Sequence, residues 1–470
     1  MRYLLIFTTL LFISNIAVSA TIIKAGNLEY AGRKLDFYAN ADPVTGNKAF
    51  ITSLEFDKNG QGSISVDITA PTFVFSDFGI YHGMLILEPN QTLELKLPPR
   101  REKSFADEKN PYFEPVQFWF VTQNKSQLAS QISDFTIRLN QLTNKYFDQL
   151  YFRQSRKIYD SILYYIDKEL PANASDAFNF HKNFSLKMVE AEAFREKPDS
   201  YTELFSKVNP EYWLLPAYIG LMERTFNNLL SFEAKSVKGD EIRNAVNGSN
   251  TNYLLGLLKD KYKVTGENAQ IILLKLLHDA WYSGDFSKKA IETMVNSTVF
   301  VNNKNKIVQI TSRNINEKIT FLQPGNVAPV ICLKDFSGKT NCTDITAGKF
   351  KYIVFADVEM VVCQEHLKYL TSIQERFQKY LEIFIVLRKT DQTEMKKFLD
   401  SNKVPGIKMI DENGEFITKY KIKSFPQCFL LNEKHQVSLV SAKAPLNGFE
   451  QQFGTFLQHE LFEKQRNQSR

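Results

Sequence analysis

The sequence predicts a multidomain α+β protein of 470 residues, with an N-terminal β-sandwich, a central α-helical region and a C-terminal α/β domain. Three successive hydrophobic patterns predict this order. Apolar and polar residues alternate up to about residue 100, apolar spacings of three and four follow to about residue 310, and strands alternate with helices beyond residue 321. A chain of this length is expected to contain two to four domains.

Composition places the chain among ordinary globular proteins, since 43% of its residues are apolar and 23% are charged. Its 58 basic and 52 acidic residues give a net charge of +6 without a concentrated basic patch, so nucleic-acid binding has little support. The 38 Phe and 20 Tyr are interpreted as core and interface packing.

Residues 1–20 have the pattern of a secretory signal peptide. Arg2 precedes an apolar run over residues 3–13, and Ala17 to Ala20 predict signal peptidase cleavage after Ala20. A membrane anchor is the alternative, but the run is shorter than the ~20 residues of a span. There is no cysteine near the cleavage site, so a lipid anchor is not indicated. No later segment is predicted to cross a membrane. The mature chain is therefore expected to be a soluble periplasmic or secreted protein.

Residues 21–100 predict a small β-sandwich domain. Residues 53–57 and 63–67 alternate polar and apolar side chains around residues 58–62, which contain two glycines. This pattern predicts a strand, a turn and a strand.

A second hairpin is predicted from residues 85–87 and 93–97, which flank Glu88-Pro89-Asn90. Pro98-Pro99 and the charged run over residues 100–109 then predict a linker to the next domain.

Residues 115–315 predict an α-helical domain. Apolar side chains keep spacings of three and four from Leu139 to Leu150 and from Ile158 to Ile166. No metal-ligand or catalytic spacing occurs here, and His181 is interpreted as part of a solvated helix surface. Further helices are predicted at residues 176–195, 217–233, 253–262 and 269–281, with prolines between them.

Residues 321–466 form the predicted α/β domain, in which strands and helices alternate. That order predicts a central sheet with helices on both faces. The predicted strands are residues 330–333, 352–355, 383–387, 428–431 and 437–440, and the predicted helices are residues 361–380, 392–399 and 448–463.

Three motifs in this last third carry a resemblance to a known family. Residues 325–339 fit G-x-x-A-P-x-x-x-L-x-D-x-x-G-K, residues 355–363 align without gaps to F-x-D-P-x-C-x-x-C, and residues 424–431 are similar to G-x-P-T-x-F-L-x. In this order they resemble the thioredoxin superfamily, in particular its exported TlpA-like and redoxin-like (AhpC/TSA-type) branch. The resemblance implies a thioredoxin-like fold and a cis proline at Pro426.

The resemblance also implies that the first cysteine of the redox pair should stand at position 360, where this chain has Met360. In the family that cysteine lies at the exposed amino end of a helix, which lowers its pKa and makes it the nucleophile. Methionine cannot supply a thiolate, so only Cys363 of the pair remains. A peroxiredoxin activity is not expected either, because its reactive cysteine would stand near the same place.

Four cysteines are candidates for the remaining thiol chemistry, and they permit three complete pairings. Cys363 is predicted to be an inert thiol packed on the inner face of a helix. The alternative is a monothiol, or half of an unusual disulfide with Cys428. Cys332 and Cys342 flank a predicted turn, and they are expected either to pair across it or to stay free.

A binding groove is the remaining candidate site. A cis Pro426 after Phe425 would shape a groove beside Met360, with Val361 and Val362 completing an apolar floor. Such a groove could bind an extended peptide through backbone hydrogen bonds. The alternative is that the same patch is a contact covered by the helical domain.

Two functions from different classes follow from these observations. The first is a redox-silent, TlpA-like protein that binds or scaffolds envelope proteins or extended peptides. The second is a thiol-disulfide oxidoreductase that acts through Cys363 with Cys428 as a possible partner. The first is preferred because of Met360, and no cofactor or metal site is predicted.

Overall fold

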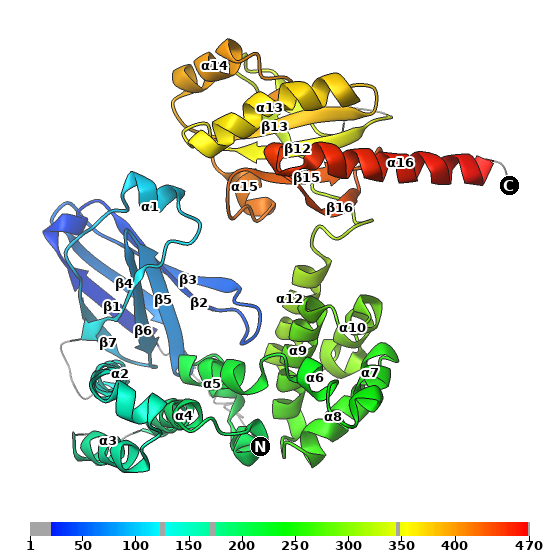
Figure 1. Ribbon diagram of the computed structural model, residues 1–470. Helices are drawn as coiled ribbons and strands as arrows, with labels where there is room; N and C mark the ends of the chain where they lie inside the picture. The colour runs from blue at the N-terminus through cyan, green and yellow to red at the C-terminus, as the bar shows by residue number, and fades with distance from the viewer. Residues whose placement is uncertain (1–19, 123–126, 170–174, 345–347, 469–470) are drawn as a thin grey trace, which may run out of the picture. The chain divides into compact units, whose positions relative to one another are not determined.

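The computed structural model describes residues 20–468 except 123–126, 170–174 and 345–347 (Figure 1). The predicted signal peptide lies outside the described residues, apart from Ala20. The chain divides into two compact units. Unit 1 comprises the chain up to Glu102 together with Pro115–Asn316, and unit 2 comprises Lys103–Glu114 together with the chain from Glu317 onward. In the part of the chain that is described, no helix has the length and apolarity needed to cross a bilayer.

The amino-terminal part of unit 1 is a sandwich of two sheets, drawn in blue in Figure 1. Their facing sides share one core, to which Ile23 and Leu93 contribute from the first sheet and Phe37 and Leu85 from the second. The first sheet has the order β4 (Gln61–Asp67), β1 (Ala20–Gly26), β7 (Thr92–Lys96) and β9 (Val121–Thr122). The second has the order β3 (Lys48–Glu55), β2 (Lys34–Asn40), β5 (Thr72–Phe78), β6 (Tyr81–Leu87) and β8 (Val116–Trp119).

The positions of the strands in the sequence were predicted better than the pairing of each strand with its neighbours. β3 and β4 lie in different sheets, as do β6 and β7, so neither predicted hairpin forms; the hairpins are β2–β3 and β5–β6. An alternating pattern shows which face of a strand is buried but not which strand lies beside it. β8 and β9 also lie beyond residue 115, where helices were predicted, and each strand extends one sheet of the sandwich.

Helices cover the outer side of the second sheet. Phe73 and Phe75 of β5 point away from the sandwich core and pack among Leu128, Ile132 and other helical side chains. β5 is therefore buried on both faces, and four consecutive residues of it, Phe73 to Ser76, are buried. The covering elements are α2 (Leu128–Lys145), the π-helical turn η2 (Asp148–Phe152), α3 (Arg156–Glu169) and α4 (Asp176–Ala193).

The rest of unit 1 is helical, and α9 (Gly266–Ser283) lies at its centre with residues 271–274 fully buried. The other helices of this part are α5 (Pro216–Phe226), α6 (Leu229–Glu233), α7 (Gly239–Asn247), α8 (Thr251–Asp260), α10 (Lys288–Val295), α11 (Thr298–Val301) and α12 (Lys306–Thr320). Buried Asp42, in the turn between β2 and β3, accepts a 2.7 Å hydrogen bond from Asn314 of α12 and so joins the sandwich to these helices.

His181 is buried, which corrects its interpretation as a solvated residue. It is 4% exposed, and its ring packs edge-on against Trp119 and Phe135 at centroid distances of 6.1 and 5.8 Å. Its Nδ1 has no hydrogen-bond partner among the described residues. Burial lowers the pKa of His181 to about 4. α4 is buried on more than one side, so its polar positions do not mark a solvent face.

Unit 2 is built around a five-stranded sheet. Its order is β14 (Ile407–Asp411), β13 (Leu381–Arg388), β12 (Phe350–Ala356), β15 (Gln427–Leu431) and β16 (Val437–Ala442). β12, β13 and β14 are parallel, whereas β15 and β16 run antiparallel to their neighbours. Every residue of the central strand β12 is buried.

Helices lie on both faces of this sheet. α13 (Val361–Phe377), α14 (Gln392–Ser401) and α16 (Phe449–Gln468) share one core with the sheet, and α15 (Glu415–Lys419) packs on the other face with Ala328 and Ile331. A two-stranded ladder of β10 (Cys332–Lys334) and β11 (Thr340–Cys342) stands apart from the main sheet. Strand order and helix placement are those expected of a thioredoxin-like domain.

The buried imidazole predicts a pH-dependent stability of unit 1. The pKa of folded His181, about 4, lies below its ordinary value of 6.5, so the neutral ring favours folding above pH 6.5 and this contribution is lost as the pH falls towards 4. Between pH 7 and pH 4, we expect the His181→Phe variant to lose about 3 kcal/mol less stability than the wild type. Denaturant unfolding at several pH values measures this difference, and identical losses in both proteins would contradict it.

Candidate functional site

The site predicted from the sequence lies where β12 ends and α13 begins. A loop of Asp357, Val358 and Glu359 joins the strand to Met360, the residue that precedes the first turn of the helix. The Met360 N–H donates to the Asp357 carbonyl at 3.1 Å, and its half-buried side chain packs against the core of unit 2. Met360 thus occupies the helix terminus where a thiol would have its pKa lowered, but a thioether has no proton to lose.

Neither remaining thiol near this loop is placed for attack. Cys363 lies one turn into α13 and is completely buried, and burial raises the pKa of its thiol to about 11. Cys428 lies on β15 with 6% of its surface exposed, and burial raises its pKa to about 12. Both cysteines are free. A reactive cysteine needs exposure and a lowered pKa, and these two have neither.

A buried ion-pair network occupies the loop in front of Met360. Asp357 has no exposed surface, and its Oδ2 lies 2.6 Å from Lys109 Nζ and 3.3 Å from Arg388 Nη1. Its other oxygen accepts a 3.0 Å hydrogen bond from the Glu359 N–H. Lys109 also pairs with the Glu359 carboxylate at 2.7 Å. A buried carboxylate is costly unless it is paired, and two cations pair this one.

Lys109 comes from the segment Lys103–Glu114, which belongs to unit 2 although the residues before and after it belong to unit 1. It is the last residue of α1 (Phe105–Lys109), a short helix whose start is capped by Ser104 and Asp107. The sequence predicted this stretch as a linker. Its charge run was visible, but nothing in the pattern showed which lysine would meet Asp357, some 250 residues away.

The predicted groove residues lie at the same end of the sheet. β12 leads into the Met360 loop, β15 begins directly after Pro426, and the two strands are neighbours. The Phe425–Pro426 peptide bond is cis. Val361 is 71% exposed and Val362 is 47% exposed, whereas Phe425 and Met360 are half-buried against the core. We call Met360, Val361, Val362, Phe425 and Pro426 the apolar patch.

A pocket of about 490 Å³ adjoins the loop on the side of α14. Glu359 and Gln364 line it from the loop and α13, and Asp391 and Glu394 line it from the start of α14. Lys397 also lines the pocket and lies 3.8 Å from Glu394, and Glu359 is paired with Lys109, so the pocket carries charges of both signs.

The other two cysteines form a disulfide. Cys332 and Cys342 face each other across the β10–β11 ladder with their Cα atoms 4.1 Å apart. With Asp344 they make up the one group of three potential metal ligands in the described part of the chain. Because both sulfurs are bonded to each other, this group offers no thiolate to a metal in this state.

No family model and no curated protein matches this chain. Solved structures that resemble it cover a part of the chain. The thioredoxin domain of a thiol-disulfide oxidoreductase from Bacteroides vulgatus is 19% identical, with a TM-score of 0.27 over 29% of this chain and 98% of that one. A thiol:disulfide interchange protein from Bacteroides sp. is 20% identical, with a TM-score of 0.26 over 28% of this chain and 91% of that one.

StoA from Bacillus subtilis is 20% identical, with a TM-score of 0.23 over 26% of this chain and 95% of that one. At these identities and TM-scores the matches say nothing about the activity of this chain. The thioredoxin-like character of unit 2 rests on its own strand order and helix placement.

The ion pair between Lys109 and Asp357 predicts a strong energetic coupling. We expect Lys109→Met to destabilise unit 2 by roughly 2–3 kcal/mol, because it leaves a buried carboxylate with Arg388 as its remaining cation. A double-mutant cycle with Asp357→Asn should give a coupling of about 1–3 kcal/mol in denaturant unfolding.

Lys103→Met is the matched control for this cycle. Lys103 lies in the same segment but is exposed, and its ammonium faces the Phe113 ring rather than a carboxylate. We expect this variant to change stability by less than about 0.5 kcal/mol. Equal effects of the two lysine substitutions, or no coupling with Asp357, would show that the ion pair does not hold the segment.

Proposed function

We propose that this chain is an exported, redox-silent protein that binds or scaffolds other proteins of the cell envelope through its thioredoxin-like unit. The observation that carries this proposal is Met360 at the head of α13. Thiol-disulfide exchange begins with a thiolate attacking a sulfur-sulfur bond, and the side chain at the required place cannot ionise.

The burial of the other thiols supports the same proposal against an oxidoreductase. With a pKa of about 11, on the order of one Cys363 in a thousand would be a thiolate at pH 8. That thiolate would also lie in the core, out of reach of a protein disulfide. Cys428 is equally buried and has a higher pKa, so a pair formed by the two has no exposed member to start exchange.

The apolar patch supports binding as the function that the unit retains. Val361 and Val362 expose apolar side chains beside half-buried Phe425, at the end of the sheet where β12 and β15 meet the two loops. A peptide in extended conformation can bind such a surface through its backbone, with side chains entering neighbouring pockets. The adjoining pocket, which Asp391, Glu394 and Lys397 line, would take one such side chain. Export follows from the predicted signal peptide at residues 1–20.

An insulin-reduction assay on the mature chain tests the redox-silent state. We expect no turnover by the wild type. We expect Met360→Cys to form a disulfide with Cys363 and to give measurable turnover, because the new thiol would lie at the helix terminus that lowers its pKa. Met360→Ser and Met360→Cys with Cys363→Ser serve as inactive controls. Wild-type turnover that Cys363→Ser abolishes would reject the proposal.

Site-specific photocrosslinking tests the binding role separately. A photoreactive residue at Val361, in the apolar patch, is expected to crosslink an envelope protein. The same residue at Lys368, which is exposed on the same helix two turns away, is expected to give no such adduct. Identical adducts at both positions, or none at Val361, would contradict a binding surface at the patch.

A further inference from the structure

An aromatic cluster is exposed at the turn between α2 and α3 in unit 1. Phe152 is 73% exposed and Phe147 is 46% exposed, and their ring centroids lie 5.7 Å apart. Half-buried Tyr151 completes the cluster at 5.0 Å from Phe147. Exposed aromatic side chains in mutual contact are unusual on a protein surface that has no partner, because they could lower their free energy by leaving water.

A rare backbone conformation builds this cluster. Residues Asp148–Phe152 form a single π-helical turn, in which the Arg153 N–H donates to the Asp148 carbonyl five residues earlier at 3.0 Å. The wider turn brings Phe147 and Phe152, five residues apart, to the same side. Leu150 anchors the turn in the core with no exposed surface. Isolated π-turns occur frequently at functional sites.

Cations flank the cluster in the sequence. Lys145, Arg153 and Lys157 are exposed and make no ion pair within the described chain, whereas Asp148 is the one carboxylate in the sequence from residue 145 to 157. Arg156, the fourth cation of that sequence, is held by Glu190 and Glu196. The exposed rings are thus flanked in the sequence by three cations that make no ion pair within the described chain, and Glu192 of α4 is the carboxylate that acts on Tyr151.

We propose that this turn, residues 145–157, is a membrane-surface anchor that inserts Phe147 and Phe152 among the headgroups of anionic lipids. Apolar side chains beside basic residues are the pattern of interfacial attachment, in which burial of the rings and attraction to anionic headgroups act together. The net charge of +6 for the whole chain favours approach to an anionic surface.

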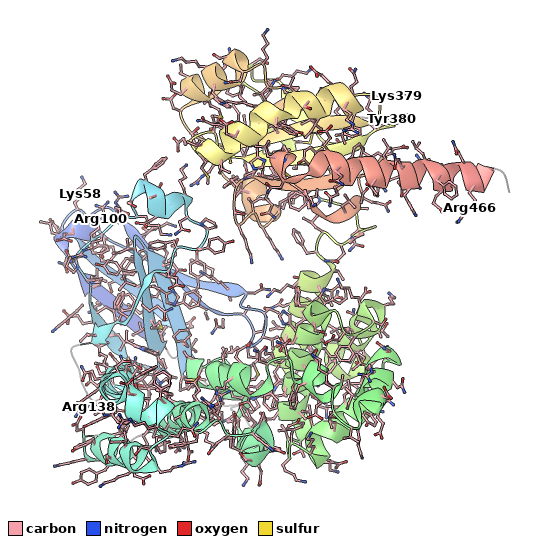
Figure 2. The ribbon with its side chains drawn as sticks, in the orientation of Figure 1. Lys58, Arg100, Arg138, Lys379, Tyr380 and Arg466 are labelled. Carbon is pink, nitrogen blue, oxygen red and sulfur yellow. A yellow bond between two sulfur atoms is a disulfide. The ribbon has the colours of Figure 1, made fainter. Side chains whose placement is uncertain are left out.

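The exposure of the turn favours a lipid surface over a protein partner. The turn joins α2 to α3, and Figure 1 draws these two helices at the edge of unit 1. Arg138 of α2, labelled in Figure 2, pairs with Glu169 of α3 at 2.6 Å and ties the two helices together. Two exposed rings that no described side chain covers suit insertion into a fluid interface, whereas docking of a protein would need a matching concave surface.

Vesicle sedimentation of the chain from residue 21 onward tests the proposal. We expect the wild type to sediment with vesicles of equal parts phosphatidylcholine and phosphatidylglycerol, and binding should weaken as salt is raised. Phe147→Ser with Phe152→Ser is expected to lower the partition coefficient about tenfold or more. Arg153→Gln with Lys157→Gln is expected to remove the preference over pure phosphatidylcholine vesicles.

Phe232→Ser is the matched control, because Phe232 is 69% exposed on α6 and lies near Lys235 and Lys238 in the sequence. It should bind vesicles as the wild type does. The exchanged side chains are exposed, so the circular dichroism spectrum and the melting temperature of each variant should not change. If the aromatic variant misfolds, the charge variant still tests the surface. Failure of the wild type to bind, or equal weakening by Phe232→Ser, would overturn the proposal. The proposal would also be overturned if Phe147 and Phe152 bound a protein but no vesicle.

Discussion

A carboxylate without access to water organises the loop at the centre of unit 2. Asp357 directly follows the fully buried strand β12 and has no exposed surface, and Lys109 and Arg388 pair with its carboxylate. The same contact holds the segment Lys103–Glu114 to unit 2 and fixes the loop that presents Met360. The geometry of a reactive helix terminus is therefore maintained at a position that has no reactive group.

The retained scaffold and the lost thiol together explain why binding is the preferred function. A helix terminus beside a second loop at the end of two neighbouring strands makes a surface for an extended chain whether or not it carries a nucleophile. What remains there is apolar, with exposed Val361 and Val362 in place of a dithiol. The aromatic turn of unit 1 is independent of this surface, since its rings and cations lie between residues 145 and 157 of unit 1.

Sequence patterns predicted local features and missed those that depend on distant partners. The strands of the sandwich and the alternation of unit 2 follow from periodicity, but the partners of β3 and β7 depend on how two sheets pack. His181 resembled a surface residue because its neighbours on α4 are polar, and the buried ring became evident when Trp119 and Phe135 were placed around it. Met360 could be assigned from motif spacing, whereas Lys109 could not be found, because an ion pair across the chain leaves no local signal.

Thiol counting on the native and the denatured mature chain tests the central claim most directly. Without reductant, we expect no rapidly alkylated cysteine in the native protein at pH 8 and two, Cys363 and Cys428, after denaturation, because both are free and buried. Mass spectrometry of the labelled peptides identifies the modified residues. Rapid labelling of Cys363 in the native protein would mean that this thiol is exposed and ionised, and the redox-silent function would then be wrong.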